Sequence, residues 1–276
     1  MKKLYFSMLL MAGLVLTACS SDDNSTEPEP QAPKTYYMTV DASKAVNEAF
    51  SRVSTRALSL DGSTLNASWA TTENVYVQGT LKSDGTTKFW FKGSIKPQYA
   101  GTTTRLNGVI SLPDGWAYTS ITSIDDAIST PHTLTLQFPR SGELDYTGQV
   151  GTLADIAAKY DYAVAENARV DVEADKVKGV FEETFVNQQA IVKFTLRDKT
   201  DATKLLNPTA LNIQYGEDNL SLTIPESTYT TNGDGVLYVA IPGFSGKLVL
   251  TATVGGVEHK FTKNSVTFKN GKYYEF

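Results

Sequence analysis

Most of the chain alternates apolar and polar residues with a period of two. In VKFTLR, residues 192–197, the side chains of Val192, Phe194 and Leu196 share one face. The same alternation recurs in TLTLQF (133–138), LSLTI (220–224) and LVLTATV (248–254). Successive side chains of a β-strand point to opposite faces. The pattern therefore predicts strands with one buried and one wet face, as antiparallel sheets have.

Turn dipeptides separate these segments. They are Asp84-Gly85, Asp114-Gly115, Asn232-Gly233, Gly255-Gly256 and Asn270-Gly271. Such pairs favour tight hairpins, and many short strands at this spacing predict an all-β protein of the β-sandwich type. The segment NGDGV, which begins at Asn232, lacks the alternating oxygen ligands of a calcium loop, so we interpret it as a hairpin turn as well.

One segment departs from the β pattern. In GTLADIAAKYDYAVA, residues 151–165, Thr152 and Asp155 stand at the spacing of a helix N-terminal capping box. Apolar residues recur after them at helical spacing, which predicts a short helix with one buried face. A single helix between two strand-rich halves suggests a domain junction, and we expect the boundary near residue 165.

The N-terminus has the features of a lipoprotein signal. Lys2 and Lys3 precede an apolar run from Leu4 to Leu16, which is too short for a membrane span of ~20 residues but suits a secretory signal. The run ends in Leu-Thr-Ala-Cys, which resembles a bacterial lipobox. We expect cleavage before Cys19 and lipidation of that residue, with attached acyl chains anchoring the protein in the outer membrane at the cell surface. The alternative is an ordinary signal peptide.

The expected domain organisation follows from these features. Residues 1–18 form the signal peptide, and residues 19–34 form a flexible tether rich in Ser, Asp, Glu and Pro. Residues 35–165 form an N-terminal β-sandwich and residues 166–276 form a C-terminal one. About 240 residues are enough for two such domains.

Composition and motifs argue against several function classes. The formal net charge is −5 without a basic block, so nucleic acid is not an expected partner. Cys19 is the only cysteine, which excludes an internal disulfide and a thiolate metal site in the mature domains. No phosphate-binding, dinucleotide-binding, serine-hydrolase or zinc-protease motif is present. We therefore expect no enzyme, cofactor or metal.

Histidines and aromatic residues give weak candidates. His132 is expected to be exposed and His259 to lie at a core rim, so neither is interpreted as a ligand or base. In KFWFK, residues 88–92, Trp90 should face away from the core. Trp90, Trp116 and Tyr118 are the candidate residues for stacking on a sugar ring.

Four segments together resemble one protein family. They are STRALSLDGSTLNASWATTENVYV (54–77), GTLADIAAKYDYAVA (151–165), FVNQQAIVKFTLRD (185–198) and VTFKNGKYYEF (266–276). In this order, and after a lipobox, they resemble the fimbrillin-like surface lipoproteins of Bacteroidetes. The acidic SSDD stretch after Cys19 is similar to the surface-export signal of lipoproteins from that phylum.

The resemblance implies two β-sandwich domains of transthyretin-like topology and a structural or adhesive role in a surface fimbria. It also implies proteolytic processing between Arg56 and Ala57 by a trypsin-like protease, with Arg52 as the second choice. Processing would remove the lipid and the first strand, and a strand from another fimbrial subunit would fill the vacated groove. The alternative for Arg56 is an ordinary solvated charge.

The two ends of the chain sharpen this expectation. In YYMTV, residues 36–40, Tyr36, Met38 and Val40 share one face, as expected for the displaced first strand. At the other end KYYEF is expected to serve the second domain's own sheet, which favours a terminal or accessory subunit that accepts a strand. The alternatives are a stand-alone surface lipoprotein that binds glycans of host or bacterial surfaces and a lipidated anchor for the filament base.

Overall fold

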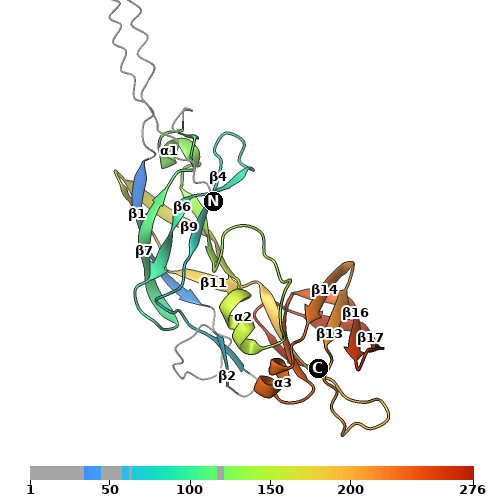
Figure 1. Ribbon diagram of the computed structural model, residues 1–276. Helices are drawn as coiled ribbons and strands as arrows, with labels where there is room; N and C mark the ends of the chain where they lie inside the picture. Colours follow the sequence, from blue (N-terminus) through green and yellow to red (C-terminus); the bar gives the residue numbers. More distant parts are fainter. Residues whose placement is uncertain (1–33, 45–57, 62–63, 117–120) are drawn as a thin grey trace, which may run out of the picture. The chain divides into compact units, whose positions relative to one another are not determined.

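The computed structural model describes residues 34–44, 58–61, 64–116 and 121–276 (Figure 1). The predicted signal peptide and nearly all of the predicted tether lie outside these ranges. Strands dominate the described residues, so the expectation of an all-β protein is confirmed.

Nine strands of the first part of the chain form one hydrogen-bonded sheet. The order is β5 (Lys88–Trp90), β4 (Tyr76–Thr80), β8 (Thr133–Phe138), β9 (Ala163–Glu173), β10 (Lys176–Gly179), β1 (Thr35–Lys44), β7 (Thr103–Ser111) and β6 (Lys92–Pro97). The ninth strand, β11 (Glu183–Asn187), pairs with both β1 and β9. A bridge between Val75 and Ile95 brings β6 next to the start of β4, so the sheet folds over its own core.

The second part of the chain forms two smaller sheets. One has the order β15 (Val236–Pro242), β12 (Gln189–Thr195) and β18 (Tyr273–Glu275). The other has the order β14 (Asp218–Thr223), β13 (Ala210–Tyr215), β16 (Phe244–Val254) and β17 (Val257–Phe268). Apolar side chains of both sheets share one core, which makes this part a β-sandwich. A separate hairpin joins β2 (Leu58–Asp61) to β3 (Thr64–Ala67).

The period-two pattern places side chains as the sequence predicts. The inward residues of the quoted segments that are almost fully buried are Leu134, Leu136, Phe138, Val192, Phe194, Leu220, Leu222, Ile224, Leu248, Leu250 and Ala252. The predicted hairpin at Gly255-Gly256 is also present, since both glycines have positive φ angles and connect β16 to β17.

The predicted helix is present as α2, Leu153–Lys159. The Thr152 hydroxyl accepts a hydrogen bond from the Asp155 backbone N–H at 3.1 Å, which is the expected cap. Two further short helices were not predicted, α1 (Ile124–Ala127) and α3 (Ser227–Asn232). The interpretation of Asn232-Gly233 as a hairpin turn is wrong, because Gly233 ends α3 and its N–H donates to the carbonyl of Tyr229 at 2.9 Å.

The two hydrophobic clusters do not separate at a single boundary near residue 165 of the chain. That residue lies inside β9, whose partners β8, β10 and β11 all belong to the first sheet. The first cluster continues to Phe185, whereas the second cluster includes Ile156 and Tyr160 from α2 and its C-cap. The chain therefore contributes to the second core, returns to the first sheet, and enters the second core again from Ala190.

Candidate functional site

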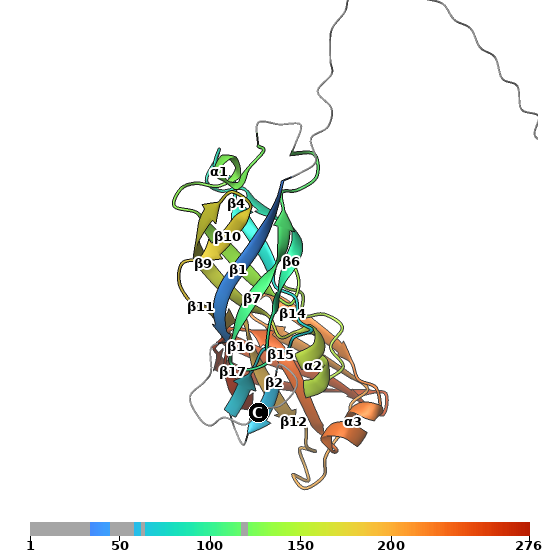
Figure 2. The same cartoon turned by 90° about the vertical axis from the view of Figure 1, so that its left-hand side faces the viewer.

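The first strand, β1, lies in the middle of the large sheet (Figure 2). It pairs with β7 antiparallel over nine consecutive residue pairs. On its other side it pairs in parallel with β10 and then with β11. Among the described residues it is the first element, so a cut between β1 and β2 separates it from every strand with which it pairs.

The inward face of β1 is fully buried. Tyr36, Met38, Val40 and Ala42 are each at most 1% exposed and belong to the first hydrophobic cluster. The expectation of a shared buried face for Tyr36, Met38 and Val40 is therefore confirmed. The Tyr36 hydroxyl also accepts a hydrogen bond from the backbone N–H of Ile124 at 3.0 Å. The face thus offers both apolar contacts and one buried polar contact.

Lys44 continues this inward row at the end of β1 and is only 1% exposed. Its Nζ lies 3.4 Å from Glu73 Oε1, 3.5 Å from Asp161 Oδ2 and 3.2 Å from the backbone carbonyl oxygen of Ser68. The ammonium group has three N–H donors, which match these three acceptors.

Aromatic rings enclose the same ammonium group. The Nζ of Lys44 lies 4.6 Å from the ring centroid of Trp69 and 4.1 Å from that of Phe138. A cation over a ring face is attracted by the ring quadrupole, and the attraction grows when water is excluded. The site is therefore shaped for a buried cation.

Groups other than Lys44 also hold the two carboxylates of Glu73 and Asp161 in place. Asp161 is fully buried, and the side-chain N–H of Gln189 donates to its Oδ1 at 3.4 Å. The Ala70 backbone N–H donates to Glu73 Oε2 at 3.0 Å. Burial raises the pKa of both carboxyls, and the nearby Lys44 charge opposes that rise. A charged group in this position needs its partner, because an unpaired buried ion is strongly unfavourable.

The sequence pattern does not predict this cluster of Lys44, Glu73 and Asp161, although it contains a partial signal. Lys44 lies two residues beyond Ala42, in phase with the buried row of β1. A charged residue in that phase usually marks the end of a strand, and nothing local links it to Asp161, which is 117 positions away.

The outward face of β1 is exposed and carries weaker contacts. Asp41 forms an ion pair with Arg105 of β7, with an N–O distance of 2.8 Å, and both side chains are about half exposed. Tyr37 and its cross-strand neighbour Val109 are also exposed. Exposed ion pairs stabilise little. The buried face therefore dominates the retention of β1.

The predicted processing residues lie outside the described residues. Cys19, Arg52, Arg56 and Ala57 all precede β2 in the sequence, and the three at positions 52–57 follow β1. Their lipidation and cleavage stay predictions.

The structure places two of the three candidate sugar-stacking residues. Trp90 is partly exposed in β5, on the opposite side of the strand from Phe89. Trp116 packs on Phe89 with ring centroids 4.5 Å apart, next to the first core. Tyr118 lies outside the described residues.

The exposure of the two histidines differs from what the sequence predicts. His132 is buried, with its Nε2 3.1 Å from Asp125 Oδ1, because α1 covers the start of β8. His259 is exposed on β17, the edge strand of its sheet. His259 lines a hollow together with Phe261 and Phe276, so strand parity places it beside an open space and does not lead to burial.

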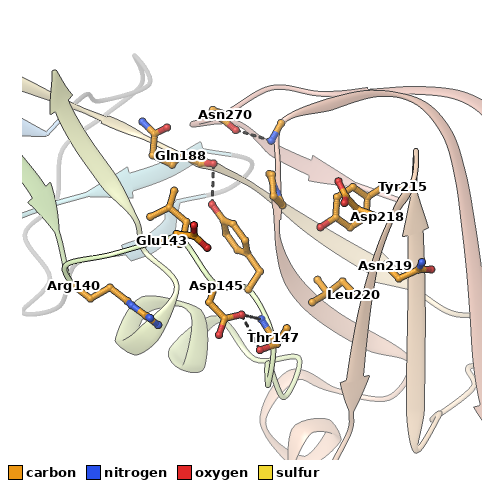
Figure 3. A pocket seen from close by; sticks show the side chains of 14 residues that line it. Arg140, Glu143, Asp145, Thr147, Gln188, Tyr215, Asp218, Asn219, Leu220 and Asn270 are labelled. Carbon is orange, nitrogen blue, oxygen red and sulfur yellow. Dashed lines mark hydrogen bonds between the residues drawn. The ribbon is translucent and has the colours of Figure 1, made fainter. Parts of the chain in front are cut away.

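A pocket of about 800 Å³ lies between residues 140–147 and the β13–β14 hairpin (Figure 3). Arg140, Glu143 and Asp145 lie on one side of it, and Tyr215 and Asp218 on the other. The carboxylate of Asp145 accepts hydrogen bonds from the Thr147 N–H and hydroxyl at 2.9 and 2.8 Å. Most of the side chains that line this pocket are polar.

A second hollow of about 990 Å³ lies in the second sandwich. Phe194, Leu250, Phe261 and Phe276 contribute apolar side chains to it. It lies between the edge strands β17 and β18 of the two smaller sheets.

In the part of the chain that the structure describes, no helix is long and apolar enough to cross a membrane. No group of three or more His, Cys, Asp or Glu side chains there is arranged to hold a metal ion.

No protein-family model and no curated protein matches the chain, but solved structures do. A fimbrial protein from Bacteroides ovatus matches with 10% identity and a TM-score of 0.37, over 89% of this chain. This chain covers 49% of that protein, about half of its length. The chain is similar to fimbrial proteins of Bacteroidetes.

Two more fimbrial structures match over most of both chains. One is a fimbrial assembly protein from Parabacteroides distasonis, with 8% identity, a TM-score of 0.36 and coverage of 88% of this chain and 90% of that one. The other is the tip fimbrial protein from Porphyromonas gingivalis with a C-terminal truncation, with 10% identity, a TM-score of 0.34 and coverage of 87% and 93%.

Proposed function

We propose that this protein is a structural subunit of a cell-surface fimbria, and that it joins the filament by exchange of β1. In this proposal a lipid on Cys19 holds the precursor at the outer membrane. Cleavage after Arg56 then frees β1 from the rest of the chain, and a strand of another subunit takes its place. The role requires no catalysis.

One observation carries the proposal, the central position of β1. This strand has a buried face and is hydrogen-bonded on both sides, to β7 and to β10 and β11, yet a single cut between Lys44 and Leu58 disconnects it. Loss of a central strand exposes unpaired backbone groups on both sides and an apolar groove between them. Such a gap binds an incoming strand by β-augmentation, in which main-chain hydrogen bonds supply affinity and alternate side-chain pockets supply specificity.

The buried face accounts for a large driving force. Burying Tyr36, Met38 and Val40 contributes about 5–9 kcal/mol gross, at roughly 1.5–3 kcal/mol for each side chain. Backbone groups on β7, β10 and β11 add the cost of unmade hydrogen bonds in an empty groove. An empty groove is therefore a high-energy state, which favours direct replacement of one strand by another.

We propose a terminal or accessory position in the filament, in which the subunit accepts a strand at the β1 groove. Tyr273, Tyr274 and Glu275 of β18 pair in parallel with β12. The backbone of Phe276 exchanges hydrogen bonds of 2.8 Å with Lys193 and Thr195. These residues already take part in the second domain's own sheet.

The test is the N-terminus of the protein recovered from the bacterial surface, measured by mass spectrometry. We expect a chain that starts at Ala57. Replacing Arg56 with alanine should leave an N-terminus at acylated Cys19 and prevent assembly into filaments, whereas replacing Arg52 should change neither. A native filament whose subunits retain residues 35–44 covalently would contradict the proposal.

A further inference from the structure

Lys44 places a buried positive charge at the end of β1, which exchange of an apolar strand does not by itself require. Its ammonium group occupies a fully enclosed receptor made of Ser68, Trp69, Glu73, Phe138 and Asp161. All five lie after position 56, so they remain with the folded body when a cut after Arg56 frees β1. Only the cation itself belongs to the strand that leaves.

We infer that the β1 groove selects an incoming strand by a lysine placed two residues after a row of four alternating apolar residues. This inference rests on the proposed exchange of β1. The partner segment has the pattern apolar-x-apolar-x-apolar-x-apolar-x-Lys and runs in the direction of β1. Its apolar side chains fill the places of Tyr36, Met38, Val40 and Ala42, and its lysine fills that of Lys44.

The charge balance of the vacated site explains the selection. Without a cation, Asp161 and Glu73 are two carboxyls beside each other, with side chains 1% and 10% exposed in the occupied site. A strand with an apolar residue at this place would close the groove over them and leave them buried without a partner. Truncating one partner of a buried, hydrogen-bonded charge pair weakens association strongly.

The geometry favours lysine over arginine. Three acceptors surround a single nitrogen at 3.2–3.5 Å, from the Ser68 carbonyl and the carboxylates of Glu73 and Asp161. The three donors of an ammonium group converge on one point, whereas a guanidinium is a planar fork that needs acceptors side by side. The ring of Phe138, 4.1 Å from the nitrogen, leaves little room for the wider group.

The same receptor fixes the register. In a groove lined only by apolar pockets, each pocket can bind the apolar side chain meant for its neighbour with a modest loss of affinity. An apolar strand can therefore slip by two residues and keep the same face buried. A slip of two residues would place the lysine in the apolar site of Ala42 or beyond the groove. One buried polar residue is a known means of setting register in helical assemblies, and here it would set the register of a strand.

The experiment uses the mature full-length protein cut after Arg56, with its own β1 fragment still bound. Fluorescein-labelled peptides of residues 34–45 compete with that fragment, and uptake is followed by anisotropy and native mass spectrometry. The peptides are the wild-type sequence, Lys44→Met and Asp41→Asn. Each variant removes one charged group from the peptide, a positive one at Lys44 and a negative one at Asp41, but Asp41 faces outward in an exposed ion pair with Arg105.

We expect the wild-type peptide to enter the groove and the Lys44→Met peptide to bind roughly 30- to 1,000-fold more weakly. The Asp41→Asn peptide should bind within about fivefold of wild type. A protein with Asp161→Asn should show a smaller difference between the lysine and methionine peptides.

The outcomes separate this inference from the proposed function. Equal uptake of the wild-type and Lys44→Met peptides would overturn the selection by lysine and leave strand exchange standing. If no peptide enters at any concentration, the proposed exchange of β1 itself is wrong. Equal losses for the Lys44→Met and Asp41→Asn peptides would show that the buried place of Lys44 confers no selection beyond that of an exposed charge, and would also overturn the inference.

Discussion

Replacing Lys44 with methionine in the intact chain measures what the buried cation contributes to the fold. Methionine retains much of the apolar stem against Trp69 and Phe138 but removes the charge. Breaking a buried ion pair costs about 3–5 kcal/mol, because the remaining ion is left without a partner. The two carboxyls left behind, Asp161 and Glu73, limit that cost, since each can bind a proton instead of staying charged.

The limit can be worked out for Asp161, whose ordinary pKa is 3.8. Holding this group protonated at pH 7 costs about 4 kcal/mol, at about 1.4 kcal/mol for each pH unit above the ordinary pKa. At pH 5 the same limit falls to about 1.6 kcal/mol. We therefore expect a loss of about 3–4 kcal/mol in the free energy of unfolding at pH 7 and about 1.5 kcal/mol at pH 5.

The sign follows from proton linkage. Without the lysine, the pKa of Asp161 in the folded state rises further above its value in the unfolded state. Such a group favours folding below its unfolded pKa, and this contribution is lost as the pH rises through the folded pKa. The difference between wild type and variant must therefore grow from pH 5 to pH 7.

Urea unfolding followed by tryptophan fluorescence provides the assay, because the Trp69 ring centroid lies 4.6 Å from Lys44 Nζ. Lys92→Met is the matched control. Lys92 pairs with Asp114 on the surface, with side chains 51% and 77% exposed, so its loss should cost less than about 1 kcal/mol at either pH. A Lys44→Met loss below 1 kcal/mol at pH 7, or an equal loss at both pH values, would refute the reasoning.

Two other substitutions test how β1 is held. Tyr36→Phe removes the buried acceptor of the Ile124 N–H and should lower the free energy of unfolding by about 1–3 kcal/mol in urea titrations, whereas Tyr37→Phe on the exposed face should have no measurable effect. A Cβ at Gly179 would lie 3.1 Å from a methyl group of Val40, so Gly179→Val should lower the free energy of unfolding by about 1–3 kcal/mol. The same variant should release β1 faster after cleavage, which native mass spectrometry can follow. Unchanged release would contradict the close packing.

The local elements follow from the sequence because their causes are local. Alternation of apolar residues places the inward faces of β8, β12, β14 and β16, and the Thr152 cap starts α2 where predicted. The buried face of β1 was also predictable from Tyr36, Met38 and Val40. These features depend on side-chain period and on hydrogen bonds between near neighbours, both of which can be read along the chain.

Only the tertiary structure decides which strands pair with one another. It also decides the surroundings of Lys44, the residue that follows the apolar row of β1. The pairing of β1 with β7, β10 and β11 joins segments far apart in the sequence, and period two does not specify partners. For the same reason β9 extends past the expected boundary. The receptor for Lys44 depends on Glu73 and Asp161, which come near each other only when the strands are assembled. A lone charged residue in a strand has no local sign of burial, because its burial is determined by partners that only the fold supplies.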